Sequence, residues 1–206
     1  MSQSGPSPLL WTGLGNPEPA MLRNRHNIGF MALDTIAIRH NFSPWRQRFK
    51  GLAAEGVIAG QKIIALKPLT YMNASGESVQ PAAAFFKIPP AAITVFHDEL
   101  DLAPGKVRVK IGGGAAGHNG LRSIAQHLGT PDFWRVRLGI GHPGDKNRVL
   151  GYVLGDFAKE DLAWLLPCLD AVANEAALLI ANKPDEFMSR VAAATKGVEG
   201  EQKNGL

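Results

Sequence analysis

The chain alternates between short apolar runs and longer segments in which apolar residues recur every three or four positions. Compact apolar runs, and runs in which apolar and polar residues alternate, predict β-strands. These strands cover residues 9–14, 52–57, 63–66, 93–96, 106–111 and 134–140. The helical spacing predicts α-helices over residues 27–40, 75–87, 117–128 and 160–181, and a last helix from Pro184.

This interleaving predicts an α/β fold, a single-domain three-layer α/β/α sandwich around a central twisted mixed sheet. The strands that flank Ala59-Gly60 are expected to form a hairpin, which makes the sheet mixed rather than purely parallel. Two prolines fall inside predicted helices. Pro81 is compatible with its helix only near the first turn, and Pro167 is expected to kink the long helix.

The domain organisation is simple. No internal repeat, low-complexity tract or linker divides the 206 residues, a length typical of one domain. We expect residues 1–8 to be a disordered lead, residues 9–195 to form the folded domain, and residues 196–206 to be a flexible tail.

Composition narrows the class of protein. A hydrophobic content of 45% and a charged content of 19% are typical of globular chains. No apolar stretch reaches the roughly 18–20 residues of a membrane span, and the N-terminus lacks the basic head and apolar core of a signal peptide. The single cysteine, Cys168, lies among leucines and is expected to be a core residue. These features predict a cytoplasmic protein, and the net charge of +4 permits a polyanionic partner without requiring one.

Polar residues stand at the ends of several predicted elements. Ligands of α/β sheets bind where strands end and loops converge, so such residues can meet at one edge of the sheet. Taken singly, each has a plainer explanation, because Asn and Asp are common helix caps and turn formers. The residues concerned are Asn16, His26, Asn27, Asn73, Asp98, His118 and Asn119.

His26 is the strongest candidate for a general base, because only histidine changes charge near neutral pH unaided. A carboxylate such as Asp98 would orient its ring and stabilise the protonated form. The alternative is a surface histidine at the start of a helix, and the local sequence does not decide between the two. His97 adjoins Asp98 on a predicted strand, where neighbours point to opposite faces, so it is not expected to be the partner of Asp98.

Other chemistries find less support. Neither a G-x-S-x-G nucleophile motif nor an H-E-x-x-H zinc motif is present, and the acidic stretch from His97 to Asp101 has no second histidine at matching spacing. The run from Gly112 to Asn119 resembles a phosphate-binding loop, but His118 replaces its lysine and Asn119 its magnesium-binding hydroxyl. A nucleotide-binding protein is therefore the weakest hypothesis, although backbone N–H groups of this loop could still face an anion or a carbonyl.

Basic residues alternate with apolar ones along two predicted strands. They are Lys106, Arg108 and Lys110 on one strand, and Arg135 and Arg137 on the other. Alternation places each set on one face of the sheet, and such a row is often an ordinary solvated face. The two strands of this chain lie near the glycine-rich loop in sequence, and this favours contact of their basic residues with a phosphate backbone. No aromatic stripe suited to stacking single-stranded bases is evident, so we expect recognition of shape and phosphate.

Six motifs together are far more specific than any one of them. They are Gly13-Leu14-Gly15-Asn16-Pro17, Arg25-His26-Asn27-Ile28-Gly29, Lys67-Pro68-Leu69-Thr70-Tyr71-Met72-Asn73-Ala74-Ser75-Gly76, His97-Asp98-Glu99-Leu100-Asp101, Gly117-His118-Asn119-Gly120-Leu121 and Arg137-Leu138-Gly139-Ile140-Gly141. In order and spacing they resemble the bacterial peptidyl-tRNA hydrolase family, over roughly residues 9–190.

The resemblance implies a monomeric enzyme, without metal or other cofactor, that cuts the ester between a peptide or N-blocked aminoacyl group and the 3′ terminal ribose of tRNA. It implies His26 as the base that activates water, Asp98 as its orienting partner, and Asn16 as the residue that receives the blocked, amide-bearing end of the peptide. Asn73 and Asn119 would hold substrate and water and stabilise the oxyanion. The other expected contacts, to the peptide, the terminal adenosine or acceptor-arm phosphates, are Met21, Tyr71, Met72, His118, Lys110 and Arg137.

The sequence departs from the family pattern around this expected site. Glu18 and Met21 stand where glycine and tyrosine are usual, Asn24 replaces a threonine, and Ala115 and Ala116 replace histidine and glycine. The changes give slight support to an alternative, a non-catalytic RNA-binding relative of the same fold. The intact base, carboxylate and asparagines favour the enzyme.

Overall fold

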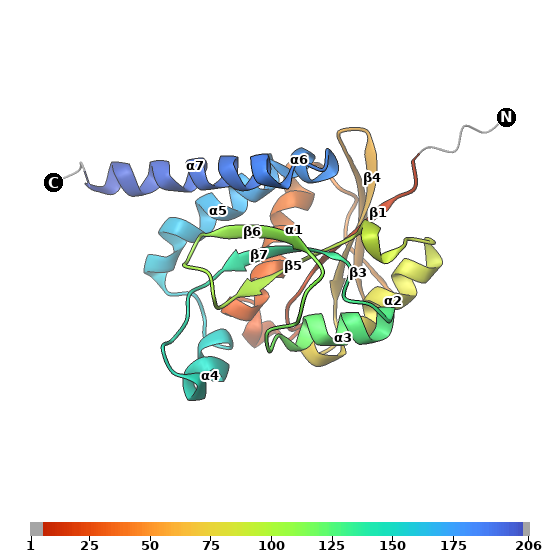
Figure 1. Ribbon diagram of the computed structural model, residues 1–206, viewed down its shortest axis with the longest axis horizontal. Helices are drawn as coiled ribbons and strands as arrows, with labels where there is room; N and C mark the ends of the chain where they lie inside the picture. The colour runs from red at the N-terminus through yellow and green to blue at the C-terminus, as the bar shows by residue number, and fades with distance from the viewer. Residues whose placement is uncertain (1–5, 204–206) are drawn as a thin grey trace.

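A mixed sheet with the strand order β2-β3-β4-β1-β5-β7-β6 forms the centre of the protein (Figure 1). The computed structural model describes residues 6–203, with side chains for residues 6–196. The strands β1, β4, β5 and β7 are parallel, whereas β2, β3 and β6 pair antiparallel with their neighbours, which confirms the predicted mixed sheet. Their bounds are β1 (Leu9–Gly13), β2 (Arg46–Arg48), β3 (Gly51–Ile58), β4 (Gln61–Pro68), β5 (Ile93–Glu99), β6 (Val107–Ile111) and β7 (Trp134–Gly139).

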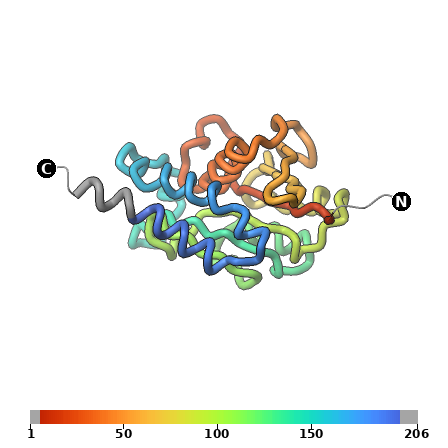
Figure 2. Tube along the Cα trace, turned by 90° about the horizontal axis from the view of Figure 1, so that it is seen from above, coloured from red at the N-terminus to blue at the C-terminus, as the bar shows by residue number. Residues whose placement is uncertain are grey.

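Helices cover both faces of the sheet, as the three-layer prediction required (Figure 1). One face is covered by α1 (Ile28–Arg39), α5 (Leu162–Asn174), α6 (Ala176–Ile180) and α7 (Pro184–Lys203), and the other by α2 (Gly76–Phe85) and α3 (Asn119–Leu128). Figure 2 shows α5 and α7 lying side by side over the first face. A short helix, α4 (Val149–Val153), lies beyond the sheet edge. The described residues also form six 3-10 turns: η1 (Pro19–Met21), η2 (Arg25–Asn27), η3 (Met72–Ala74), η4 (Pro90–Ala92), η5 (Lys146–Arg148) and η6 (Lys159–Asp161).

The predicted hairpin between β3 and β4 is confirmed. Ile58 pairs with Gln61, and the two residues between them, Ala59 and Gly60, have φ angles of 48° and 79°. Two consecutive positive φ angles give the turn a twist that matches the twist of the strands it joins.

The prediction about Pro81 was wrong, and the long predicted helix is divided. Pro81 lies beyond the first turn of α2, since that helix begins at Gly76. The segment 160–181 contains Pro167 inside α5. It divides at Glu175, whose φ and ψ of −93° and 7° lie outside the helical region, into α5 and α6.

The chain ends differ from the predicted boundaries. The tail was expected from residue 196, but α7 continues through that position to Lys203. The expected lead over residues 1–8 falls partly outside the described residues, which begin at residue 6.

Two glycines bring the start of α1 against the central strands. A Cβ on Gly13 would lie 2.3 Å from the carbonyl oxygen of Gly29, and a Cβ on Gly29 would lie 2.3 Å from the carbonyl oxygen of Phe96. No side chain fits at such distances, so glycine at both positions lets the backbones touch. This close packing holds the turn η2, just before α1, beside the end of β5.

Candidate functional site

A cavity of about 840 Å³ opens where β1 and β5 end and where α2 and α3 begin. Its size is within the range of small-ligand sites, and its place agrees with the strand-end rule for α/β sheets. Eight residues expected from the sequence line this cavity: Asn16, His26, Tyr71, Met72, Asn73, Asp98, His118 and Asn119.

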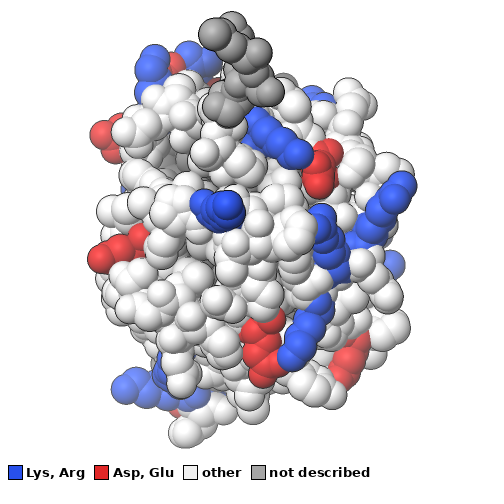
Figure 3. All heavy atoms as spheres, turned by 90° about the vertical axis from the view of Figure 1, so that its right-hand side faces the viewer, with Lys and Arg blue, Asp and Glu red and all other residues white. Residues whose placement is uncertain are grey.

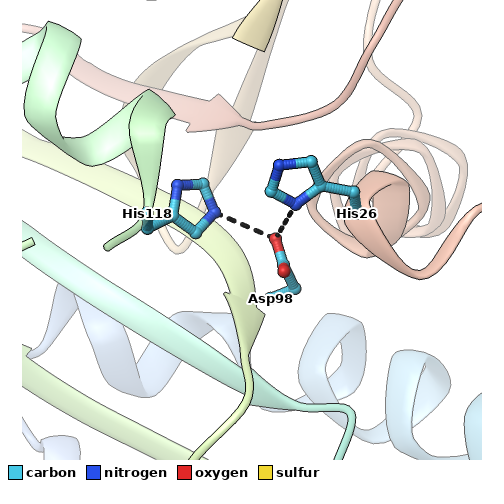
Figure 4. Close-up of side chains that lie close together, drawn as sticks. All are labelled: His26, Asp98 and His118. Carbon is cyan, nitrogen blue, oxygen red and sulfur yellow. Dashed lines mark hydrogen bonds and ion pairs between the residues drawn. The ribbon is translucent and has the colours of Figure 1, made fainter. Parts of the chain in front are cut away.

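His26 and Asp98 meet at the floor of the cavity (Figure 4). His26 belongs to η2 and Asp98 to β5, and Nδ1 of the histidine lies 2.8 Å from Oδ1 of the carboxylate. Both side chains are largely buried, with exposed fractions of 13% and 3%. Burial disfavours the charged imidazole, but the charge and hydrogen bond of Asp98 outweigh it and raise the pKa of His26.

His118 contacts the same carboxylate oxygen, which the sequence did not predict (Figure 4). Its Nε2 lies 2.9 Å from Oδ1 of Asp98, while its Nδ1 accepts hydrogen bonds from the backbone N–H groups of Gly120 and Leu121. Backbone N–H groups can only donate, so Nδ1 carries no proton and Nε2 must carry one. His118 is therefore a neutral donor to Asp98 that also caps the start of α3.

This arrangement also fixes the proton positions on His26. Asp98 is ionised, because although burial would raise its pKa, the hydrogen bonds donated by the two histidines that face it hold that pKa below its usual range. An ionised carboxylate only accepts, so Nδ1 of His26 donates to it. The lone pair of the neutral imidazole is then on Nε2, the nitrogen that Figure 4 shows pointing away from Asp98. A base with a free lone pair beside a cavity can remove a proton from a bound water or hydroxyl.

His97 takes no part in this contact with the carboxylate, as its place on the strand predicted. Its Nδ1 donates to the backbone oxygen of Asp98 at 2.7 Å, and its ring packs edge-on against His118. Burial of the ring is the largest cause, and it lowers the pKa of His97 to about 3. The ring is therefore neutral at physiological pH.

Asn16 is held by three hydrogen bonds that define which group it offers to a ligand. Its backbone N–H donates to Oδ1 of Asn27 and its carbonyl accepts from Nδ2 of Asn27, each at 2.9 Å. Its own Oδ1 accepts from the backbone N–H of Met72 at 3.0 Å. Within the described residues Nδ2 has no protein acceptor, so Asn16 presents an N–H donor to the cavity.

The remaining lining residues are more open. Tyr71 is 66% exposed, and Asn73 is exposed on η3. Asn119 is also exposed, and its Oδ1 accepts from Arg122 at 3.3 Å. These three side chains form the rim rather than the floor of the cavity.

Comparison with known proteins identifies the family. Residues 10–199 match the family described as Peptidyl-tRNA hydrolase. The chain belongs to the peptidyl-tRNA hydrolase family. The peptidyl-tRNA hydrolase of Granulibacter bethesdensis is 71% identical over 190 residues, which cover 92% of this chain and 98% of the relative. That of Acidiphilium cryptum is 71% identical over 187 residues, covering 91% and 97%.

Solved structures agree with the fold as well as the sequence. The crystal structure of peptidyl-tRNA hydrolase from Acinetobacter baumannii is 38% identical and superposes with a TM-score of 0.84, over 92% of this chain and 97% of that one. The predicted peptidyl-tRNA hydrolase family and α/β class are thus both confirmed. Among the described residues, no helix combines the length and apolar character needed to cross a membrane.

Three residues expected from the peptidyl-tRNA hydrolase resemblance lie outside the cavity lining. Met21 lies on η1, Lys110 on β6 and Arg137 on β7. Nε of Arg137 donates to Glu99 at 2.9 Å, so its charge is partly neutralised within the protein. Burial and the positive charges of Arg137 and Arg135 lower the pKa of Lys110, which marks a local concentration of cations.

The prediction of a basic row was wrong for one of its residues. Arg135 was expected in a basic row that faces a phosphate backbone, but its side chain is buried. Its two terminal nitrogens donate to the carbonyl oxygens of Gly114 and Gly113, at 2.6 Å and 2.7 Å, and one reaches Pro131 at 3.3 Å. Arg135 therefore supports the glycine-rich loop from below instead of facing a partner.

The cluster of His26, Asp98 and His118 could also be considered as a metal site, because their ligand atoms lie within 4.8 Å of one another. Both histidine nitrogens that face Asp98 carry protons in the hydrogen-bonded arrangement. A metal would have to displace both protons, and His118 would then lose its neutral form or its backbone contacts. The donor set fits a hydrogen-bonded base better than a metal ion.

One wall of the cavity has no counterpart in the sequence predictions. It is formed by apolar residues of α4 and the residue after it, Val149, Leu150, Val153 and Leu154. Sequence patterns gave no signal here, because a helix of five residues is too short for a recognisable period.

Proposed function

We propose that this chain hydrolyses the ester between a peptide, or an N-blocked aminoacyl group, and the 3′ terminal ribose of tRNA, releasing free tRNA. Membership of the peptidyl-tRNA hydrolase family supports this activity. The single structural observation that carries the proposal is the 2.8 Å contact between His26 and Asp98, which leaves Nε2 of His26 free at the cavity.

In this mechanism Nε2 of His26 removes a proton from water while the water oxygen attacks the ester carbonyl carbon. The resulting imidazolium is stabilised by the ionised Asp98. As the tetrahedral intermediate collapses, the bond from carbon to the ribose oxygen breaks and His26 returns its proton to that oxygen. The products are a peptide with a free carboxyl group and a tRNA with a free ribose hydroxyl.

Asn16 supplies a physical reason for selecting blocked substrates. The amide of a peptide, or of an N-acyl group, has a carbonyl oxygen that can accept from Nδ2 of Asn16. A free aminoacyl group has only a charged ammonium, which is itself a donor and would leave the asparagine unpaired. We propose that this mismatch excludes aminoacyl-tRNA, with Asn73 and Asn119 holding the substrate and the attacking water.

The tRNA would approach across the cavity rim. Tyr71 and Met72 are suited to packing along the peptide or the terminal adenosine, and His118 supports the same rim through α3. Lys110 and Arg137 would contact phosphates of the acceptor arm, outside the cavity, where their combined charge favours an anion. Because Met21 lies outside the lining, we assign it no contact. The family resemblance further suggests a cytoplasmic monomer.

The deciding experiment compares N-acetyl-aminoacyl-tRNA with unblocked aminoacyl-tRNA as substrates of the purified protein. We expect release of the acyl group from the first and little from the second. His26→Ala should lower kcat by a factor on the order of a hundred to ten thousand, since it removes the general base. His40→Ala is a matched control, because that histidine instead contacts a backbone oxygen of Ala173 on α5.

Three results would each overturn part of the proposal. The absence of release by the wild-type protein would favour the non-catalytic RNA-binding alternative. Equal release from both substrates would remove the role given to Asn16. Normal turnover by a folded His26→Ala variant would show that another group is the base.

A further inference from the structure

The turn that carries His26 is joined on its other side to the segment that follows α4. Arg25 directly precedes His26 in η2, and nothing in the catalytic proposal uses it. Its side chain contacts residues more than 125 positions later in the chain.

The contacts of Arg25 form a clamp rather than a single ion pair. Nη1 donates to the backbone oxygen of Asp156 at 2.8 Å, and Nη2 donates to the carboxylate of Asp161 at 3.1 Å. The guanidinium group lies 4.5 Å from the ring centre of Tyr152 and 5.6 Å from that of Phe157. A guanidinium group is a planar cation that donates hydrogen bonds along its edge and packs its face against aromatic rings. The contacts of Arg25 satisfy both of these properties.

Backbone contacts on either side of Arg25 reinforce the same junction. The N–H of Arg25 donates to the oxygen of Gly155 at 3.0 Å, and the N–H of Phe157 donates to the oxygen of Arg23 at 3.0 Å. Nδ2 of Asn24 donates to the Asp156 carboxylate at 2.8 Å. The two segments are thus paired along several residues, with the Arg25 side chain at the centre.

The clamped segment continues directly from the apolar wall of the cavity. Val149, Leu150, Val153 and Leu154 line the cavity on that side, and the residues that contact Arg25 begin at Tyr152. Leu150 is 69% exposed, so much of this wall faces open space. A short helix with an exposed apolar face keeps its position through contacts at its ends, and the Arg25 clamp links this end of α4 to the turn that carries His26.

We propose that Arg25 is a positioning residue that fixes the apolar wall of α4 at a set distance from His26, and so determines how well the substrate's acyl side chain is gripped. The inference rests on the proposed function for its substrate. It assigns Arg25 to binding rather than to proton transfer, because the Arg25 side chain contacts the wall segment and not the His26–Asp98 pair.

The test compares Arg25→Gln and Arg25→Lys with the wild-type protein, using N-acetyl-leucyl-tRNA and N-acetyl-glycyl-tRNA. Arg25→Gln should raise KM for the leucyl substrate by about tenfold, since it removes charged hydrogen bonds, while kcat stays within about twofold. KM for the glycyl substrate, which has no side chain to grip, should change much less. Arg25→Lys keeps the positive charge but lacks the planar guanidinium that donates to two acceptors at once, and should give an intermediate KM.

Two further measurements separate positioning from a general loss of stability. The pH midpoint of kcat/KM should be unchanged in Arg25→Gln, because the His26–Asp98 pair is intact. Amide hydrogen exchange over residues 149–157 should be faster in Arg25→Gln than in the wild type, and this needs no substrate. The control Arg39→Gln removes an exposed pair with Asp170 at 3.5 Å and should change neither.

Unchanged KM and unchanged exchange in a folded Arg25→Gln variant would overturn the inference while leaving the proposed function standing. A fall in kcat with a shifted pH midpoint and unchanged KM would also overturn it, because Arg25 would then act on the base. Failure of the wild type to release any acyl group would count against the proposed function alone, and the exchange measurement would still decide whether the clamp holds α4.

Discussion

At the scale of single residues, the site is built so that only one nitrogen is available to take up a proton. Oδ1 of Asp98 accepts from both His26 and His118. His118 cannot accept a proton on Nδ1 without losing two backbone donors. His97 has a pKa of about 3 and stays neutral. A proton that enters this group of histidines near neutral pH therefore goes to Nε2 of His26.

This arrangement predicts a simple pH dependence. Since the pKa of His26 is raised above 6.5, kcat/KM should fall, as pH decreases, through a single acid limb whose midpoint lies above that value. Asp98→Asn removes the attraction but leaves the burial, which lowers the pKa, so the midpoint should move to lower pH. The same variant should lower kcat/KM by a factor on the order of a hundred or more. A pH–rate profile of both proteins measures the midpoint, and an unmoved or higher midpoint in Asp98→Asn would contradict this assignment.

The sequence predicted which polar residues meet at the cavity better than it predicted what each one does there. His26 and Asp98 were paired correctly because one stands at the start of a predicted helix and the other at the end of a predicted strand, where such elements meet at one edge of the sheet. The contact of His118 with Asp98 depends on the path of the glycine-rich loop, which no periodicity describes. Likewise, Arg135 and Arg137 share one alternation pattern, but only the structure shows that Arg135 is bound to carbonyl oxygens of the glycine-rich loop.

At the scale of elements, the glycine-rich loop between β6 and α3 depends on one buried arginine. Gly112, Gly113 and Gly117 have positive φ angles, so this stretch has little preference of its own for a single path. The bonds from Arg135 to the carbonyls of Gly113 and Gly114 supply that preference. The loop leads directly to His118 and Asn119, so its path determines where both side chains lie.

Arg135→Gln should therefore affect both stability and binding. Loss of the charged hydrogen bonds should lower the free energy of unfolding by about 3 kcal/mol, measured by urea denaturation. The freed loop should also raise KM, since Asn119 would no longer be held at the rim. Arg108→Gln is the matched control, because among the described residues that arginine, on the neighbouring strand, donates only to the adjacent Val107 carbonyl. Wild-type stability in Arg135→Gln would show that the loop needs no such support.

Element prediction succeeded where hydrophobic periods were long and failed where tertiary contacts decide the ends. The strands β1, β5 and β7 and the helix α1 lie close to their predicted bounds. β2 was missed because Arg46-Gln47-Arg48 contains no apolar residue, and it exists through pairing with β3. The division of 160–181 at Glu175 was missed because proline was the only visible helix breaker in that segment.

At the scale of the whole molecule, the modest net charge of +4 matters less than its distribution. Figure 3 shows, on the face at the right of Figure 1, lysine and arginine side chains interspersed with acidic ones. Such a mixed surface gives weak attraction at a distance, because neighbouring opposite charges cancel beyond about 10 Å at ordinary salt. A polyanion is attracted more strongly where cations are crowded, and the lowered pKa of Lys110 beside Arg137 and Arg135 marks one such place.

Lys110→Ala should therefore change the salt dependence of kcat/KM and also raise KM. Each phosphate contact releases roughly one bound counterion, so the slope of log(kcat/KM) against log salt concentration should decrease by about 0.7–0.9 for one lost contact. KM should rise at low salt and converge with the wild-type value at high salt. Lys62→Ala removes an exposed lysine on β4 that pairs with Glu55 at 2.8 Å, and should leave the slope unchanged. If Lys110→Ala keeps the wild-type slope, the crowded cations are not where the tRNA backbone binds, and the acceptor arm must cross another face of the protein.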